Sequence, residues 1–220
     1  MSGYRGIIIN KTDTLARWGL ILGANYVIER PQKKELWQDI PGANGALDYS
    51  EALTGYPVYN MRTLSLPLVC GRNDASLEDA YEELQNLHAG TTAKITVPWD
   101  MEHYYLGTLR VGQMQNYNGG TIPLTLYAQP YRLQILSTVL KRNISTTPST
   151  IILKNEQMPV IPTITVSTAT TITFEGTTYN VAAGTVRLVN ILLTEGNNLF
   201  TVATGAGTGT ITFSYQEGAL

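Results

Sequence analysis

Strict alternation of apolar and polar residues in the last third of the chain restricts that part to β-structure. The alternation is clearest over residues 163–167, 171–174 and 210–215, where Thr or Ser alternates with Ile, Val, Phe or Tyr. Successive side chains of a strand point to opposite faces, so this pattern buries one face and exposes the other. With turn residues between the runs, residues 151–220 are predicted to form a small antiparallel β-sandwich with threonine on its outer faces and no helix.

The charged residues are distributed unevenly along the chain. Of 15 Lys and Arg and 17 Asp and Glu, only six lie within residues 151–220, and the polar Ser/Thr/Pro run 145–150 precedes this change. A chain of 220 residues also exceeds a typical single domain of about 100–150 residues. We therefore expect a first domain over residues 1–132, a linker region over 133–150 and a second domain over 151–220.

One segment of the first domain has helical periodicity. Apolar residues recur on one helical face at Leu77, Ala80, Tyr81, Leu84 and Leu87. Ser76 is suited to cap the first turn, and Gly90 follows the last turn, where a left-handed residue is common. The sequence predicts one amphipathic helix over residues 76–89.

The rest of the first domain has strand composition. Strands are predicted over residues 6–10, 17–22, 25–30, 36–40, 59–69, 93–97, 104–113 and 121–128, because these runs are short and rich in β-branched and aromatic residues. Turn chemistry occurs at 42–45 and at 118–120, and the second turn predicts a hairpin between 104–113 and 121–128. The expected fold class is mainly β: a sandwich or barrel domain with one helix, followed by a small sandwich.

Composition excludes several classes of protein. A net charge of -2 and a pI near 5.7 lack the basic character of sequence-specific nucleic-acid binders. The single cysteine, Cys70, permits neither an internal disulfide nor a thiolate metal cluster. No apolar run reaches the length of a signal-peptide core or a spanning helix, so we expect a soluble, unexported chain without membrane insertion.

Groups suited to catalysis are few. His88 is interpreted as a structural residue, a cation near the negative end of the helix dipole, and His103 as a solvated turn residue. Cys70 has the neighbours of a small buried hydrophobic residue. The acidic residues of the helix are interpreted as its solvated face, and the glycine-rich segment 204–209 as a loose hairpin turn, because it lacks the Lys-Ser/Thr ending of a phosphate loop. We expect no enzyme activity, no cofactor, and no catalytic, cofactor-binding or metal-binding residues.

Tyrosine is the abundant aromatic residue, with 13 Tyr against three Phe. Such residues suit contacts with proteins or carbohydrates as well as ordinary half-buried strand positions. Those in or beside predicted strands and turns are Tyr49, Tyr56, Tyr59, Tyr104, Tyr105, Tyr117, Tyr127 and Tyr131.

Several ordered segments resemble the distal tail protein family of long-tailed siphophages. These are residues 26–31, 40–50 and 59–66, the helix end 84–90, the strand 104–107 and the closing 128–132. The segments 196–199 and 211–218 look like the galectin-like β-sandwich that closes members of the same family. The resemblance therefore extends over nearly the whole chain and implies a galectin-like second domain.

The resemblance implies a structural hub of the virion tail tip, assembled in the cytoplasm of the bacterial host. Such a hub is a homo-oligomeric, hexameric ring whose partners are the tail tube protein and the tail-tip and receptor-binding proteins, and DNA passes through it without specific binding. Residues 1–130 would build the ring, and the sandwich would hold other baseplate proteins. Two alternatives stay open: a carbohydrate-binding module for host-surface attachment, although Trp18, Trp37 and Trp99 all precede the sandwich, and a tail-tube subunit.

Overall fold

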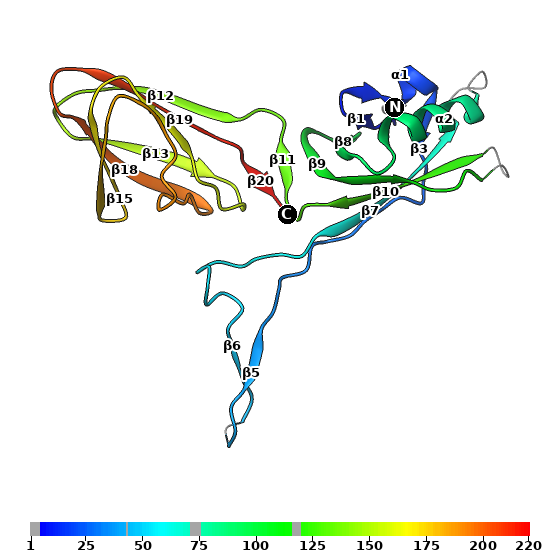
Figure 1. Cartoon of the computed structure of the whole chain (residues 1–220), viewed down its shortest axis with the longest axis horizontal. Coiled ribbons are helices and arrows are strands. Elements are labelled where there is room, and N and C mark those ends of the chain that lie inside the picture. The colour runs from blue at the N-terminus through cyan, green and yellow to red at the C-terminus, as the bar shows by residue number, and fades with distance from the viewer. Residues whose placement is uncertain (1–4, 43, 71–75, 116–119) are drawn as a thin grey trace. The chain divides into compact units, whose positions relative to one another are not determined.

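The chain folds into two compact units, Met1–Arg132 and Leu133–Leu220. The computed structural model describes residues 5–42, 44–70, 76–115 and 120–220. Strands make up most of the regular structure of the first unit and all of that of the second (Figure 1). The prediction of a mainly β chain is therefore confirmed.

The first unit is built on one antiparallel sheet with the strand order β2-β1-β8-β9-β10-β7-β3, and β4 also pairs with β7. Its strands are β1 (Ile8–Ile9), β2 (Thr12–Asp13), β3 (Leu20–Leu22), β4 (Val27–Ile28), β7 (Arg62–Cys70), β8 (Thr92–Val97), β9 (Asp100–Val111) and β10 (Thr121–Ala128). The period-two pattern of β7 turns Leu64, Leu66 and Leu68 into the core, where all three are fully buried. The predicted pairing of the strands around 104–113 and 121–128 is confirmed by the β9–β10 ladder, although residues 118 and 119 of the predicted turn lie outside the described residues.

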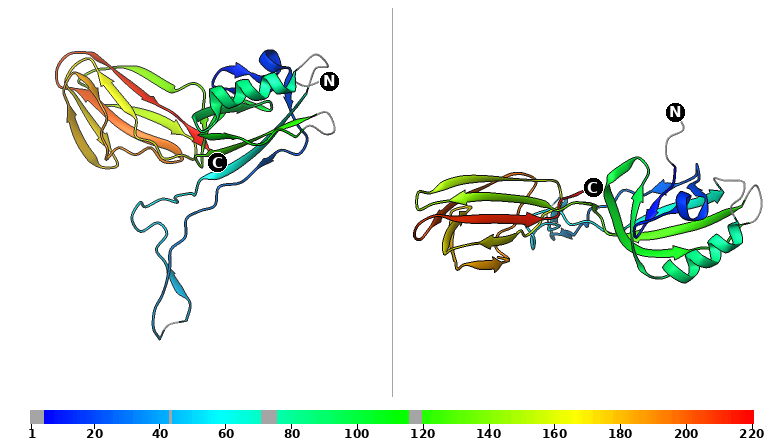
Figure 2. Two further views of the ribbon diagram at one scale, coloured as in Figure 1. Left: turned by 45° about the vertical axis from the view of Figure 1, so that its right-hand side comes forward. Right: turned by 90° about the horizontal axis from the view of Figure 1, so that it is seen from above.

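Helix α2 (Leu77–His88) lies across one face of this sheet (Figure 2). The Ser76 side chain accepts a hydrogen bond from the Asp79 N–H at 3.2 Å, so the predicted cap is present. Leu77 and Leu84 are buried, but Leu87 is 52% exposed, and His88 takes the buried position on the apolar face instead. The predicted helix is confirmed, whereas the assignment of Leu87 to its core face is wrong.

A short helix, α1 (Thr14–Trp18), replaces the beginning of the strand predicted over residues 17–22. The Asp13 carboxylate accepts hydrogen bonds from the N–H groups of Leu15 and Ala16, which starts the helix. Gly19, with φ of 68°, ends it in the left-handed conformation, and β3 begins only at Leu20. The Asp cap and the Gly stop therefore outweigh the strand composition of the segment.

The second unit is a sandwich of two four-stranded antiparallel sheets, with the orders β12-β19-β14-β17 and β13-β18-β15-β16. Its strands are β12 (Thr138–Ile144), β13 (Ser149–Asn155), β14 (Thr163–Val166), β15 (Thr170–Phe174), β16 (Thr177–Val181), β17 (Gly184–Val186), β18 (Gly196–Thr204) and β19 (Gly209–Tyr215), and the short strands β11 (Arg132–Gln134) and β20 (Gly218–Ala219) pair with each other. The three phenylalanines of the chain pack together in its core: Phe174 and Phe200 stack with ring centroids 4.6 Å apart, and Phe213 lies tilted against Phe200 at 5.0 Å. Every residue of this unit is described and none is helical, as the alternation predicted.

Two sequence interpretations fail in this unit. Residues 133–150 are not a linker, because they contain β12 and the start of β13; Ile144 is buried while its polar neighbours cover the outer face. The glycine-rich segment 204–209 is not a hairpin turn, since β18 and β19 belong to different sheets and the segment connects them. Polar outward residues concealed the strand in the first case, and local sequence does not specify the sheet of the next strand in the second.

Candidate assembly surface

The antiparallel pairing of β4 with β7 continues beyond the sheet as a long two-stranded hairpin, here called the arm (residues 29–61). Hydrogen bonds join the N–H of Glu29 to the carbonyl of Thr63 at 3.0 Å and the N–H of Lys34 to the carbonyl of Val58 at 2.7 Å. Farther out, β5 (Trp37–Asp39) pairs with β6 (Ala46–Asp48). Figure 1 shows the arm leaving the sheet of its unit.

The arm turns back between β5 and β6, around the turn predicted over residues 42–45, of which residue 43 lies outside the described residues. Gly42 and Gly45 have φ of 85° and 80°, values that side chains rarely adopt, and a Cβ at either would meet nothing within 4 Å. The outgoing strand was predicted over residues 36–40, whereas the returning strand β6 was not. Its sequence, Ala46-Leu47-Asp48, is too short to show a period.

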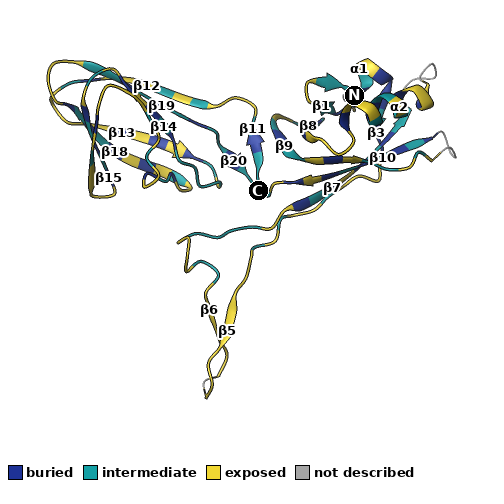
Figure 3. Ribbon diagram, in the orientation of Figure 1, coloured by how far each residue is buried: buried dark blue, intermediate teal, exposed yellow. Residues whose placement is uncertain are grey.

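The outer half of the arm (residues 35–51), together with the adjoining Leu53, exposes apolar side chains that no second layer of the described chain covers. Every residue of β5 and β6 is exposed, and this outer part of the arm is yellow in Figure 3. The large apolar side chains are Leu36 (61% exposed), Trp37 (57%), Ile40 (42%), Leu47 (45%), Tyr49 (41%) and Leu53 (100%). A two-stranded hairpin is marginal by itself in water, and contiguous exposed apolar surface marks an interaction site.

Polar interactions hold the arm in shape without burying these side chains. Lys33 and Glu51 form an ion pair at 2.6 Å across the two strands, and its hydrogen bond raises the pKa of Lys33. The Ser50 hydroxyl accepts a hydrogen bond from the Leu36 N–H at 2.8 Å. Hydrogen bonds from Ser50 also lower the pKa of Asp48, so that carboxylate stays ionised at neutral pH. The arm is thus shaped before any partner covers it.

An unusual buried cation marks the root of the arm. Arg62, the first residue of β7, is 4% exposed and faces the core, with its guanidinium 4.6 Å from the centre of the Tyr105 ring. Its Nε and Nη2 have no hydrogen-bond partner among the described residues, and burial lowers its pKa. The residues beside it in the ladder are small: Ala128, Gly107 and Ala93. Nothing in the sequence indicates that Arg62 is buried, because an arginine at the start of a strand is expected to be exposed.

His88 lies at the end of α2 as predicted, but both histidines are more buried than the sequence indicated. His88 is buried, with its ring centroid 6.4 Å from that of Trp18, edge to face, and neither ring nitrogen has a hydrogen-bond partner in the described part of the chain. Burial lowers its pKa, which favours neutral imidazole over the predicted helix-end cation. His103 lies within β9 with its Nδ1 2.8 Å from the Asp100 carboxylate, and its side chain is 13% exposed, so it is not a solvated turn residue. Tertiary packing decides both positions.

The other residues considered for chemistry are dispersed. Cys70 is half-buried and packs against the core. Of the acidic helix residues, Glu83 leaves the solvated face to accept hydrogen bonds at 2.6 Å from both Arg17 and the Trp18 indole. Among the described residues no group of three or more His, Cys, Asp and Glu side chains is arranged to hold a metal. No helix in the described part of the chain is long and apolar enough to cross a membrane.

The tyrosines named in the sequence analysis differ in how far they are buried. Tyr104 and Tyr105 are buried in β9, while Tyr49 and Tyr127 are 41% and 38% exposed. Tyr59 of the arm meets Tyr131 edge to face at 5.8 Å. Tyr117 lies outside the described residues, and Tyr56 is half-buried.

The comparisons with known proteins concern the fold. Neither a family model nor a curated protein sequence matches the chain. A solved structure does match: the crystal structure of SPP1 Dit (gp 19.1), described as a paradigm of the hub adsorption apparatus in phages that infect Gram-positive bacteria. The match has a TM-score of 0.67 and 15% identity and covers 97% of this chain and 99% of that one. The resemblance to distal tail proteins is therefore confirmed as a shared fold over nearly the whole chain.

Proposed function

We propose that this chain is a structural component of the tail tip of a long-tailed bacteriophage, a ring-forming hub between the tail tube and the baseplate or receptor-binding apparatus. The shared fold with a phage hub protein over 97% of the chain is the observation that carries the proposal. The chain would act in the virion, after assembly in the host cytoplasm. Its partners would be further copies of itself, the tail tube protein and the tip proteins.

The arm supports ring formation on physical grounds. When the arm contacts any part of a second copy other than that copy's own arm, the contact joins two different patches. Such head-to-tail interfaces close into rings when the rotation between copies allows it. Burial of exposed apolar side chains such as Trp37 would stabilise the contact by about 25 cal/mol per Å² of covered apolar area.

A hub through which DNA passes needs little affinity for phosphates. The net charge of -2 fits this requirement, because unspecific DNA binding grows with the number of cations that reach the backbone. The second unit would hold other baseplate proteins. The three tryptophans of the chain all precede this unit, which counts against a sugar site in it.

Absolute mass by light scattering on a sizing column, followed by negative-stain imaging, tests the proposal. The expected product is about 145 kDa, six copies of 24.1 kDa, with a central hole. Long stacked tubes would instead favour a tube subunit. A chain that stays monomeric at every concentration tested, and that binds a component of a glycan array, would replace the hub by a carbohydrate-binding module.

A chain ended after Arg132 tests the division of labour between the units. If the first unit builds the ring, this variant assembles like the full chain while losing its contacts with other tip proteins. A monomeric product, under conditions where the full chain assembles, would contradict that division.

A further inference from the structure

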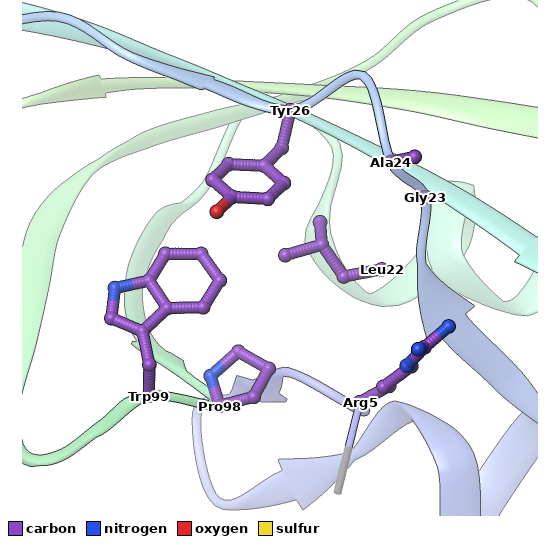
Figure 4. Close-up of a pocket in the computed structure, with 7 residues that line it drawn as sticks. All are labelled: Arg5, Leu22, Gly23, Ala24, Tyr26, Pro98 and Trp99. Carbon is purple, nitrogen blue, oxygen red and sulfur yellow. The ribbon is translucent and has the colours of Figure 1, made fainter. Parts of the chain in front are cut away.

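A second apolar surface of the first unit lies away from the outer half of the arm. It is a cleft of about 620 Å³, here called the aromatic cleft, lined by Arg5, Leu22, Gly23, Ala24, Tyr26, Pro98 and Trp99. Figure 4 shows Tyr26 and Leu22 directed into the opening, with Trp99 on one side and Arg5 on the other. The cleft joins the end of β3 to the turn between β8 and β9, and a hydrogen bond of 2.8 Å from the Leu22 N–H to the Arg5 carbonyl fixes one wall.

The composition of the cleft is that of an interface centre. The Tyr26 and Trp99 rings stack at 4.7 Å with 28° between their planes, yet they remain 42% and 52% exposed. Arg5 forms no ion pair with any described residue. Trp, Tyr and Arg are the residues most enriched among those that dominate binding energy at protein interfaces. A site with one of each therefore suits an apolar segment that also carries a carboxylate.

The outer half of the arm has this complementary chemistry. Residues 35–51 contain Glu35, Asp39, Asp48 and Glu51 and no Lys or Arg. In the β5–β6 ladder Trp37 is opposite Asp48 and Asp39 is opposite Ala46, so one face of the hairpin presents an aromatic ring and two carboxylates together. The opposite face presents Leu47 and Gln38.

The arm of the same chain does not fill the cleft. Tyr26 lies just before β4, where the arm starts, and the ladder through Glu29, Lys34 and Leu36 carries the outer half away from the sheet (Figure 1). An occupant with the arm's chemistry must therefore come from another molecule. A second copy of the chain supplies such a segment, because every copy carries both an arm and a cleft.

We infer that the aromatic cleft receives the arm of a second copy, with the hairpin face of Trp37 against Tyr26 and Trp99 and with Asp39 and Asp48 near Arg5. The inference rests on the proposed function, because it names the surface that the arm engages. It assigns different patches to the two sides of one contact. The contact is therefore head-to-tail and repeats from each copy to the next.

Disulfide cross-linking tests the contact in the full chain. In a Cys70→Ser background, Ala24→Cys places a thiol in the cleft, and Ala46→Cys places one on the Trp37 face of the arm. Oxidation of this double variant should give a ladder of species in multiples of 24.1 kDa on a non-reducing gel. The control pairs Ala24→Cys with Leu47→Cys, on the opposite face of the hairpin, and should give at least roughly tenfold less cross-linked product.

A charge exchange tests the polar half of the contact. Arg5→Glu should raise the concentration for half-maximal assembly by roughly tenfold or more, as expected for a residue at the centre of an interface. Asp39→Lys together with Asp48→Lys, added to the same chain, should restore assembly, because the charges are then exchanged across the contact. Rescue by a second change distinguishes a contact from a folding defect in Arg5→Glu.

The outcomes separate this inference from the proposed function. Rings that form without the cross-link and that tolerate Arg5→Glu contradict the cleft assignment and leave the hub intact. Cross-linked filaments or dimers without rings support the cleft and contradict the ring. A monomer that gives no cross-link contradicts both. Saturable glycan binding that is abolished by Trp99→Ala would show that the cleft binds a sugar and would contradict the cleft assignment.

Discussion

The sandwich of the second unit and the arm of the first unit are both antiparallel β-structure, but they differ in how they cover apolar side chains. The sandwich has two layers, and Phe174, Phe200 and Phe213 are covered from both sides. The arm has one layer, so Trp37 and Leu47 remain exposed although their backbones are paired. Backbone pairing alone does not complete a β-element; a second surface must cover its apolar face. The sandwich supplies that surface itself, whereas we propose that the arm obtains it from another copy.

Removal of the arm gives the largest expected effect. Residues 33–59 are replaced by Asn-Gly, which fits as a two-residue turn because the Asn60 N–H already donates to the Gln32 carbonyl at 2.8 Å. Assembly should be lost completely on a sizing column, while the far-UV circular dichroism of both units persists. Unchanged assembly without the arm would contradict the proposal that another copy covers the arm.

A pair of substitutions compares the two regions directly. Phe200→Ala, in the fully buried stack, should lower the unfolding free energy of the second unit by about 3–5 kcal/mol. Trp37→Ser should leave the unfolding free energy of the chain nearly unchanged and lower assembly instead. Urea unfolding distinguishes the units, because tryptophan fluorescence reports only the first unit and circular dichroism reports both.

Leu199→Ser is the matched control for Trp37→Ser. Leu199 is an exposed apolar residue of the sandwich, 58% exposed against 57% for Trp37. If exposure alone governs association, both changes should affect assembly equally. An effect confined to Trp37→Ser supports the arm, and an equal effect contradicts its special role.

The smallest expected effect is a pH dependence of the first unit. Burial lowers the pKa of His88 in the folded chain below its ordinary value of 6.5, so the unfolded state binds the proton more readily. The first unit should therefore lose stability as the pH falls below about 6.5. His88→Leu should flatten this dependence in fluorescence-monitored unfolding at several pH values; equal slopes for the wild type and His88→Leu would contradict it.

The sequence predicted the parts of the fold that local patterns govern. Period two identified the sandwich strands, and the Ser76 cap with its apolar face identified α2. Local patterns did not predict α1, which begins at the Asp13 cap within a segment of strand-like composition. They also did not predict β12, because its exposed Lys141 and Arg142 are typical of a linker. Placement on a buried or exposed face failed where tertiary packing decides, as for Leu87 and His88.

The candidate site was less accessible to sequence than the fold. The turn at residues 42–45 was predicted, and the resemblance included residues 40–50, but neither showed that the hairpin leaves its sheet. Arg5, Tyr26 and Trp99 are separated by up to 94 positions and meet only in the folded chain. The sequence around Trp99 does not indicate that the fold brings Tyr26 beside it.

A cryo-electron microscopy map of the assembled full chain tests the central claim most directly. The account predicts a closed ring in which residues 35–51 of each copy lie against Arg5, Tyr26 and Trp99 of the next. A ring in which each arm folds back on its own unit, or in which arms extend into solvent while copies touch elsewhere, would contradict it.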